Sequence, residues 1–126
     1  MHKVSFIGGG NMAAAIIGGL IASGTQPTDI EVVEINADAR AQLSARFGVV
    51  THTDLSQARL HGLIVLAVKP QTLPDVAASL ASRLAGHLVI SIVAGIRVAD
   101  LARWLGGHGR IVRTMPNTPA LVQAGV

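Results

Sequence analysis

Cysteine is absent from this chain of 126 residues, aromatic side chains make up only 2% of it, and charged side chains 13%. Without cysteine the chain can form no disulfide, thiolate metal site or cysteine nucleophile, and it fits a reducing, cytoplasmic setting. No apolar run approaches the roughly 20 residues that span a bilayer. We therefore expect a soluble, cytoplasmic protein with no membrane partner.

Several kinds of functional site are also missing from the sequence. The ten Lys and Arg residues give a net charge of +3 but are scattered rather than gathered in a basic stripe, so no nucleic-acid partner is expected. The five histidines show no metal-ligand spacing, and we expect no metal. The G-x-S-x-G motif of hydrolases is absent as well, and no residue stands out as catalytic.

The chain contains instead a regular alternation of apolar segments. Hydrophobic residues make up 50% of it, and a core of Val, Ile, Leu and Ala suits a parallel sheet that is buried on both faces. We expect strands at residues 3–7, 30–35, 49–51, 63–68, 87–93 and 110–115, and helices at 12–23, 37–47, 55–59, 73–84 and 98–105. This alternation predicts an α/β fold, a doubly wound parallel sheet (Rossmann) of strand order 3-2-1-4-5-6, with residues 1–126 forming a single dinucleotide-binding domain.

A glycine-rich turn joins the first expected strand to the first expected helix. It follows the pattern G-x-G-x-x-G/A, with Gly8, Gly10 and Ala13 at the three small positions. Gly8 permits the tight turn, Gly10 lets the backbone approach a pyrophosphate, and Ala13 lets the helix pack close to the strand. The amides at the start of the helix would then face the phosphates of a dinucleotide. The alternative is a strand–turn–helix connection that binds no ligand.

Ligands of an open α/β sheet bind beyond the carboxyl ends of its strands. The candidate cofactor contacts at those ends are Gly8, Gly9, Gly10, Asn11, Met12, Glu34, Asn36, Val68, Lys69, Pro70, Ala94, Gly95 and Asn117.

Three of these positions allow more than one interpretation. Glu34 lies where an acidic residue would accept hydrogen bonds from the ribose 2′-OH of NAD, or it is a solvated charge at the end of a strand. Arg40 and Arg46 can lie on the outward face of the 37–47 helix, although Arg40 or Asn36 could still receive a phosphate. Lys69 either approaches the cofactor or substrate or is an ordinary surface lysine. Asn117 hydrogen-bonds nicotinamide or substrate, or it is a turn residue.

Five stretches, taken together, resemble the N-terminal domain of the pyrroline-5-carboxylate reductase family. They are FIGGGNMA at residues 6–13, IIGGL at 16–20, AVKPQ at 67–71, SIVAGI at 91–96 and RTMPNTP at 113–119. The resemblance implies hydride transfer from NADPH or NADH to the C=N carbon of 1-pyrroline-5-carboxylate, which gives L-proline. It also implies cofactor contacts at the glycine loop, at Glu34 to Asn36, at Ala67 to Pro70, at Ala94 and Gly95, and at Asn117.

The chain departs from that family in two ways. Members that prefer NADPH often carry Asn-Arg or Ser-containing pairs where this chain has Glu34 and Ile35, so the local chemistry leans to NADH. The family's helical C-terminal domain, which makes the dimer and supplies substrate segments, is absent from these 126 residues. We expect the isolated chain to bind cofactor weakly and to be nearly inactive, and a homo-oligomer only in the full-length protein.

Two other functions remain open. The first is another NAD(P)-dependent dehydrogenase, of the β-hydroxyacid or ketopantoate reductase type. The second is a non-catalytic nucleotide-binding module.

Overall fold

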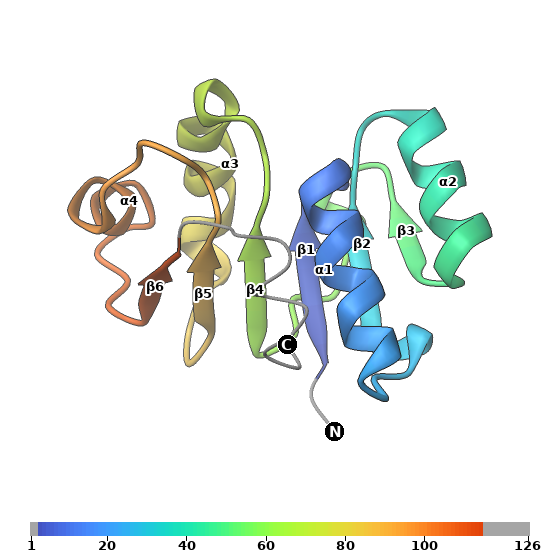
Figure 1. Ribbon diagram of the computed structural model, residues 1–126. Coiled ribbons are helices and arrows are strands. Elements are labelled where there is room, and N and C mark those ends of the chain that lie inside the picture. Colours follow the sequence, from blue (N-terminus) through green and yellow to red (C-terminus); the bar gives the residue numbers. More distant parts are fainter. Residues whose placement is uncertain (1–2, 115–126) are drawn as a thin grey trace.

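A computed structural model describes residues 3–114 of the chain, and in that part six parallel strands form one sheet of order β3-β2-β1-β4-β5-β6 (Figure 1). The expected strand order is therefore confirmed. The strands are β1 (Val4–Ile7), β2 (Ile30–Val33), β3 (Val50–His52), β4 (Leu63–Leu66), β5 (Leu88–Ser91) and β6 (Ile111–Arg113). Several are shorter than expected, because their last residues turn away from the sheet at its carboxyl edge.

The helices are α1 (Asn11–Ala22), α2 (Ala37–Phe47), α3 (Leu73–Leu80) and α4 (Val98–Trp104). Pro74 lies in the first turn of α3, where its missing N–H has no intrahelical partner to lose. The helix expected at 73–84 ends at Leu80 and continues as a 3₁₀ turn, Ala81–Arg83. None of the helices in residues 3–114 has the length and apolar character that a bilayer crossing would need.

Successive side chains of each strand point to opposite faces of the sheet, and each face has its own core. On one face Val4 and Phe6 pack with residues of α1 and α2, including Ile17 and Leu43. On the other face Ile7 packs with residues of α3 and α4. The core is aliphatic apart from Phe6 and the half-buried Phe47 and Trp104. Helices on both faces make the sheet doubly wound, as expected.

The connection from β3 to β4 differs from the others. Parallel strands are usually joined through a helix in a crossover of a dozen or more residues, but residues 53–62 contain only a 3₁₀ turn, Leu55–Gln57. The short α-helix expected at 55–59 is therefore wrong. An irregular segment that lies against a sheet has backbone polar groups that need hydrogen-bond partners.

Candidate functional site

Gly8 lies where β1 ends and the chain turns toward α1. Its φ is +101°, a conformation that glycine adopts readily and other residues rarely do. Its N–H donates to the carbonyl oxygen of Val33 at 2.8 Å. A Cβ built at this position would lie only 2.6 Å from the carbonyl oxygen of Ala67. The turn after β1 is therefore packed against the backbone that follows β4, and only glycine fits there.

Gly10 has the opposite surroundings. A Cβ built on it would have no atom within 4 Å, so the space beside the backbone is open. Gly10 is the N-cap of α1, no side chain caps this end of the helix, and its first turn contains no acidic residue. Ala13, one turn further, is 1% exposed and lies against the sheet. An uncapped helix start beside open space is the arrangement that receives phosphate in dinucleotide-binding folds.

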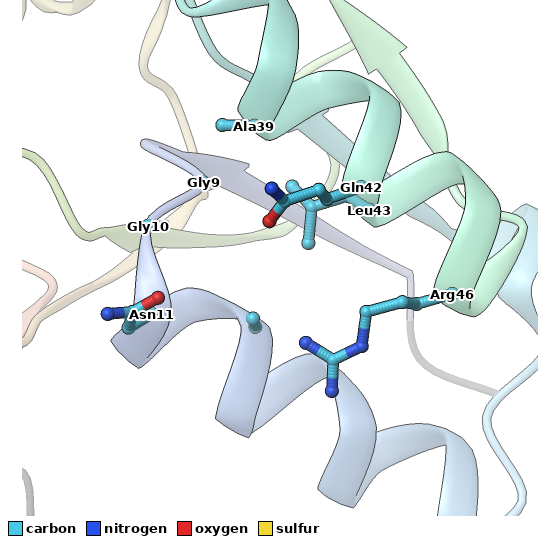
Figure 2. Close-up of a pocket in the computed structure, with 8 residues that line it drawn as sticks. Gly9, Gly10, Asn11, Ala39, Gln42, Leu43 and Arg46 are labelled. Carbon is cyan, nitrogen blue, oxygen red and sulfur yellow. The ribbon is translucent and has the colours of Figure 1, made fainter.

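A small groove lies between the start of α1 and the side of α2. It holds about 90 Å³, less than the roughly 300 Å³ at which small-molecule sites begin. The groove by itself is therefore too small to enclose a dinucleotide. Figure 2 shows Gln42 and Arg46 reaching from α2 toward α1. The lining residues are Gly9, Gly10, Asn11, Ala14, Ala39, Gln42, Leu43 and Arg46.

Glu34 follows β2 and is bound to the glycine loop. Its Oε1 accepts a hydrogen bond from the N–H of Gly9 at 2.7 Å, and its Oε2 accepts one from the N–H of Asn36 at 2.9 Å. The side chain is half-buried. Glu34 is thus not a solvated charge but part of the frame that holds the glycine loop beside the end of β2.

The turn from β2 to α2 carries a second polar arrangement. Arg40 donates from Nη1 to the carbonyl oxygens of Glu34 at 2.7 Å and of Ile35 at 3.0 Å. Asn36 caps α2, because its Oδ1 accepts from the N–H of Ala39 at 2.9 Å. The expected outward position of Arg40 is therefore wrong, since the side chain is half-buried. Helical side chains lean toward the N-terminus, and this tendency could have indicated the contact in advance.

The other candidate residues lie along the same edge. The N–H of Ala67 donates to the oxygen of Ile7 at 2.8 Å, so Ala67 and Val68 lie directly beside the glycine loop. Lys69 and Pro70 are exposed at the start of a 3₁₀ turn, Pro70–Thr72. Ala94 and Gly95 form an exposed turn after β5. Asn117 is outside the described residues.

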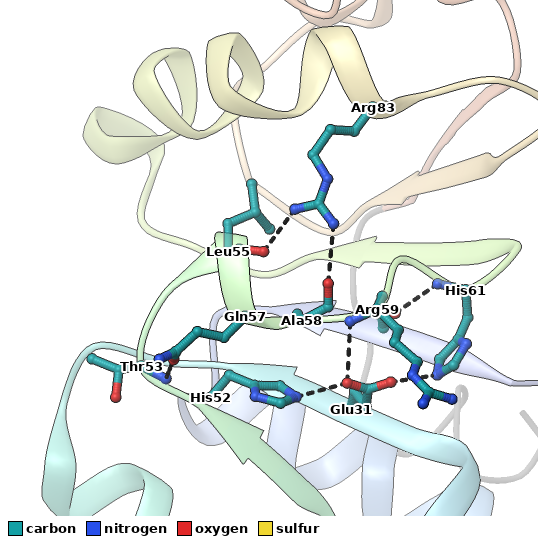
Figure 3. Close-up of polar contacts among 10 residues, drawn as sticks. Glu31, His52, Thr53, Leu55, Gln57, Ala58, Arg59, His61 and Arg83 are labelled. Carbon is teal, nitrogen blue, oxygen red and sulfur yellow. Dashed lines mark hydrogen bonds and ion pairs between the residues drawn. The ribbon is translucent and has the colours of Figure 1, made fainter.

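A polar cluster that the sequence did not reveal lies under the β3–β4 connection (Figure 3). Glu31 is only 6% exposed, and its Oε1 is 2.7 Å from Nε2 of His52 and its Oε2 2.8 Å from Nε2 of His61. The N–H of Arg59 also donates to Oε1, at 3.3 Å. The two histidines and the glutamate are far apart in sequence, so no spacing motif could have shown the cluster.

Ser5 completes this cluster on the neighbouring strand. Its Oγ donates to the carbonyl oxygen of Arg59 at 2.8 Å and accepts from the N–H of His61 at 3.0 Å. Ser5 and Glu31 therefore supply the hydrogen bonds that the irregular connection needs. Among residues 3–114, no three His, Cys, Asp or Glu side chains are placed to hold a metal ion.

Comparison with known proteins agrees with this geometry. Residues 3–95 match the family model described as NADP oxidoreductase, coenzyme F420-dependent. The chain is 41% identical over 125 residues to the pyrroline-5-carboxylate reductase of Pseudomonas aeruginosa, covering 98% of this chain and 46% of that protein. It is 44% identical over 127 residues to the enzyme of Escherichia coli, covering 98% and 47%. The chain thus spans about half the length of the curated relatives that it matches.

Two solved structures show the same relationship in three dimensions. A pyrroline-5-carboxylate reductase from Coxiella burnetii has a TM-score of 0.88 at 40% identity, over 97% of this chain and 46% of that one. The enzyme of Plasmodium falciparum, solved with NADP bound, has a TM-score of 0.80 at 27% identity, over 96% of this chain and 44% of that one. The chain therefore belongs to the family described as NADP oxidoreductase, coenzyme F420-dependent, and its resemblance to the N-terminal NADP-binding domain of the pyrroline-5-carboxylate reductases is confirmed.

Proposed function

We propose that residues 1–126 form the cofactor-binding domain of a pyrroline-5-carboxylate reductase. In the whole protein, a hydride from NADPH or NADH would pass to the C=N carbon of 1-pyrroline-5-carboxylate and give L-proline, in the cytoplasm. We further propose that a homo-oligomer forms only in the full-length protein. The relatives at 41% and 44% identity support this function.

The observation that carries the proposal is the contrast between Gly8 and Gly10. A Cβ is excluded at Gly8 by the backbone of Ala67, whereas the side of Gly10 is open. The open side of Gly10 coincides with the uncapped start of α1, so a ligand that comes close to the backbone there accounts for the glycine. The pyrophosphate of a dinucleotide fits the open space beside Gly10, because there it would meet the uncapped start of α1.

The remaining contacts follow from the order of the loops along the edge. With the pyrophosphate at the glycine loop, Glu34 and Asn36 at the end of β2 would hold one half of the dinucleotide. The residues Ala67 to Pro70 and the turn at Ala94 and Gly95 would hold the other half, with Lys69 as a nearby cation. Asn117 is proposed at the nicotinamide end. When bound, the reduced nicotinamide supplies the hydride, while these residues bind the cofactor and orient it.

The test is a titration of the Gly10→Ala variant with NADPH and NADH, followed by nicotinamide fluorescence. The new methyl group has open space and a permitted φ of −78°, so the unfolding midpoint should match the wild type. The methyl group would, however, occupy the space proposed for the pyrophosphate, and we expect the affinity for both cofactors to fall about tenfold or more. Gly62→Ala is the matched control, because position 62 is equally open but precedes β4 at the opposite edge of the sheet.

Gly8→Ala gives the complementary result. Its Cβ would clash with Ala67 at a φ that alanine rarely adopts, so we expect a loss of about 2–4 kcal/mol in the free energy of unfolding. If Gly10→Ala binds both cofactors as tightly as the wild type, the glycine loop is not the phosphate site. If the wild type binds neither cofactor, the proposed function is wrong.

A further inference from the structure

The end of β2 contains one acidic side chain that is already bound to the backbone through both of its oxygens. Both oxygens of Glu34 accept backbone amides, those of Gly9 and Asn36. An acidic residue at this position normally excludes the 2′-phosphate of NADP by charge. Here two amide dipoles stabilise the carboxylate, and it is turned toward the glycine loop. Glu34 is therefore placed to hold the loop, and its repulsion of a nearby phosphate is weakened.

The same turn holds a cation with unused donors. Arg40 binds the carbonyl oxygens of Glu34 and Ile35 through Nη1 alone. In the part of the chain that the structure describes, its Nη2 and Nε have no partner. The two carbonyl contacts fix the guanidinium at the end of β2, beside the residue that would lie nearest the adenosine ribose. The positive charge is thus held in place, with donors left over for an anion.

We propose that Arg40 is the specificity-determining residue that receives the 2′-phosphate of NADP(H), and that Glu34 positions the glycine loop rather than selecting NADH. This proposal rests on the function proposed above. A guanidinium presents several N–H donors in a plane and binds phosphate oxygens in pairs. Asn36 supports the site, because its Oδ1 is held by the N–H of Ala39 and its amide NH₂ group is left to donate.

The charges around this turn are few. Asp38 lies exposed in the first turn of α2, where solvent screens it. Glu31 is buried under the β3–β4 connection and bound to two histidines. Arg40 is the one cation between residues 31 and 45. Arg46, further along α2, lines the groove beside the glycine loop, so removing Arg40 should remove the positive charge held at the end of β2 and leave Arg46 in place.

The experiment compares ligands with and without the 2′-phosphate on matched variants at one ionic strength. NADPH and NADH are titrated by nicotinamide fluorescence, and adenosine 2′,5′-bisphosphate and 5′-AMP by calorimetry. We expect Arg40→Gln to weaken NADPH and the bisphosphate about tenfold or more, the usual effect of losing a charge-assisted hydrogen bond, while NADH and 5′-AMP change less than about twofold. Arg40→Lys should recover part of the loss. Arg103→Gln, which removes an exposed charge on α4, is the control.

Glu34→Gln separates the two roles assigned to this turn. If Glu34 positions the loop, this variant weakens NADPH and NADH by similar factors, because glutamine has one acceptor oxygen and can no longer bind the amides of both Gly9 and Asn36. If it selects NADH, the variant loses NADH affinity and gains NADPH affinity, and this part of the proposal is wrong.

The outcomes also separate this proposal from the proposed function. Equal weakening of NADPH and NADH binding by Arg40→Gln would mean that Arg40 only stabilises the turn from β2 to α2. That result would overturn its proposed role in binding the 2′-phosphate. A wild type that binds NADH and 5′-AMP but gains nothing from the 2′-phosphate would overturn it too, with cofactor binding intact. A wild type that binds none of the four ligands contradicts the proposed function itself.

Discussion

At the scale of single residues, Glu31 and Glu34 lie three positions apart and have different structural roles. Glu34 holds the glycine loop at the carboxyl edge, whereas Glu31 holds the β3–β4 connection against the sheet. For Glu31, burial is the largest influence and raises the pKa. The hydrogen bond from His52, the amide of Arg59 and the nearby charges of His61 and His52 outweigh it, and the pKa lies below its ordinary value of 4.5. The ionised form of Glu31 therefore stabilises the folded chain.

The sign of the pH dependence follows from this lowered pKa. The unfolded chain takes up a proton at Glu31 near pH 4.5, while the folded chain keeps the carboxylate ionised to lower pH. The stability from Glu31 is complete above that value and is lost as the pH falls through the folded pKa. We expect Glu31→Gln to unfold more easily at pH 7, by about 1–3 kcal/mol, and to lose less stability than the wild type on acidification below pH 4.5.

Urea denaturation at a series of pH values measures both effects. Asp38→Asn serves as the control, because it removes an exposed carboxylate that the cluster does not contact. Parallel pH profiles for the wild type and Glu31→Gln would contradict the role given to Glu31.

At the scale of elements, the ends of α2 and α3 were predictable to different degrees. The bounds Ala37–Phe47 agree with the expectation because local signals mark both ends: Asn36 caps the start, and Gly48 ends the helix with a φ of +72°. The helix at α3 ends earlier than expected, at Leu80. After it, Arg83 donates to the carbonyl oxygens of Leu55 at 2.7 Å and Ala58 at 3.0 Å. These partners lie on a distant segment, which a local pattern does not report.

This contact predicts that Arg83 fastens the β3–β4 connection from the side opposite Glu31. Arg83→Met keeps the length of the side chain but removes both hydrogen bonds, so we expect a loss of about 1–2 kcal/mol in stability. The amides of Arg59 and His61, which donate to Glu31 and Ser5, should exchange hydrogen faster. Amides within β1 should change little.

Hydrogen exchange followed by NMR measures this prediction residue by residue. Arg103→Met is the control, because Arg103 is exposed on α4 and pairs with Asp100 on the same helix. If exchange at Arg59 and His61 is unchanged in Arg83→Met, the connection does not depend on Arg83.

At the scale of the whole molecule, the described residues form one side of a cofactor site, at the carboxyl edge of the sheet, but do not enclose it. The groove at the glycine loop is small, and the curated relatives are about twice as long as this chain. Hydride transfer requires the reacting carbons to be held about 3–3.5 Å apart. We therefore expect residues beyond these 126 to complete the substrate side of the site.

A chimera tests this expectation. The 126-residue chain is joined to the second half of the Pseudomonas aeruginosa reductase, and oxidation of NADPH is followed with 1-pyrroline-5-carboxylate. We expect the chimera to turn over at least about 100-fold faster than the chain alone, because loose positioning costs roughly that factor. Fast turnover by the chain alone would contradict the need for a second half. A chimera that binds NADPH without reducing the substrate would favour a non-catalytic nucleotide-binding module.

Much of the candidate site was predictable because its signals are local. Gly8, Gly10 and Ala13 lie within six residues at the junction of β1 and α1, so their spacing alone indicates the turn. Glu34 and Asn36 come directly after β2, so their place at the edge follows from the strand order. The hydrogen-bond partners of these side chains were harder to predict from the sequence. Arg40 reaches back to the carbonyl oxygens of Glu34 and Ile35, just after β2, and Glu34 bonds to Gly9, 25 positions away in the chain.

By itself, the sequence determined the alternation of strands and helices, the strand order and the glycine turn, because hydrophobic period, helix caps and small residues act over short distances. Only the tertiary structure decided how Glu31, His52 and His61 meet, why the β3–β4 connection needs no helix, and that Glu34 is bound to the glycine loop. The physical reason is that a polar group excluded from water must find a partner wherever the packed chain provides one, and that partner is set by the fold rather than by neighbours in the sequence.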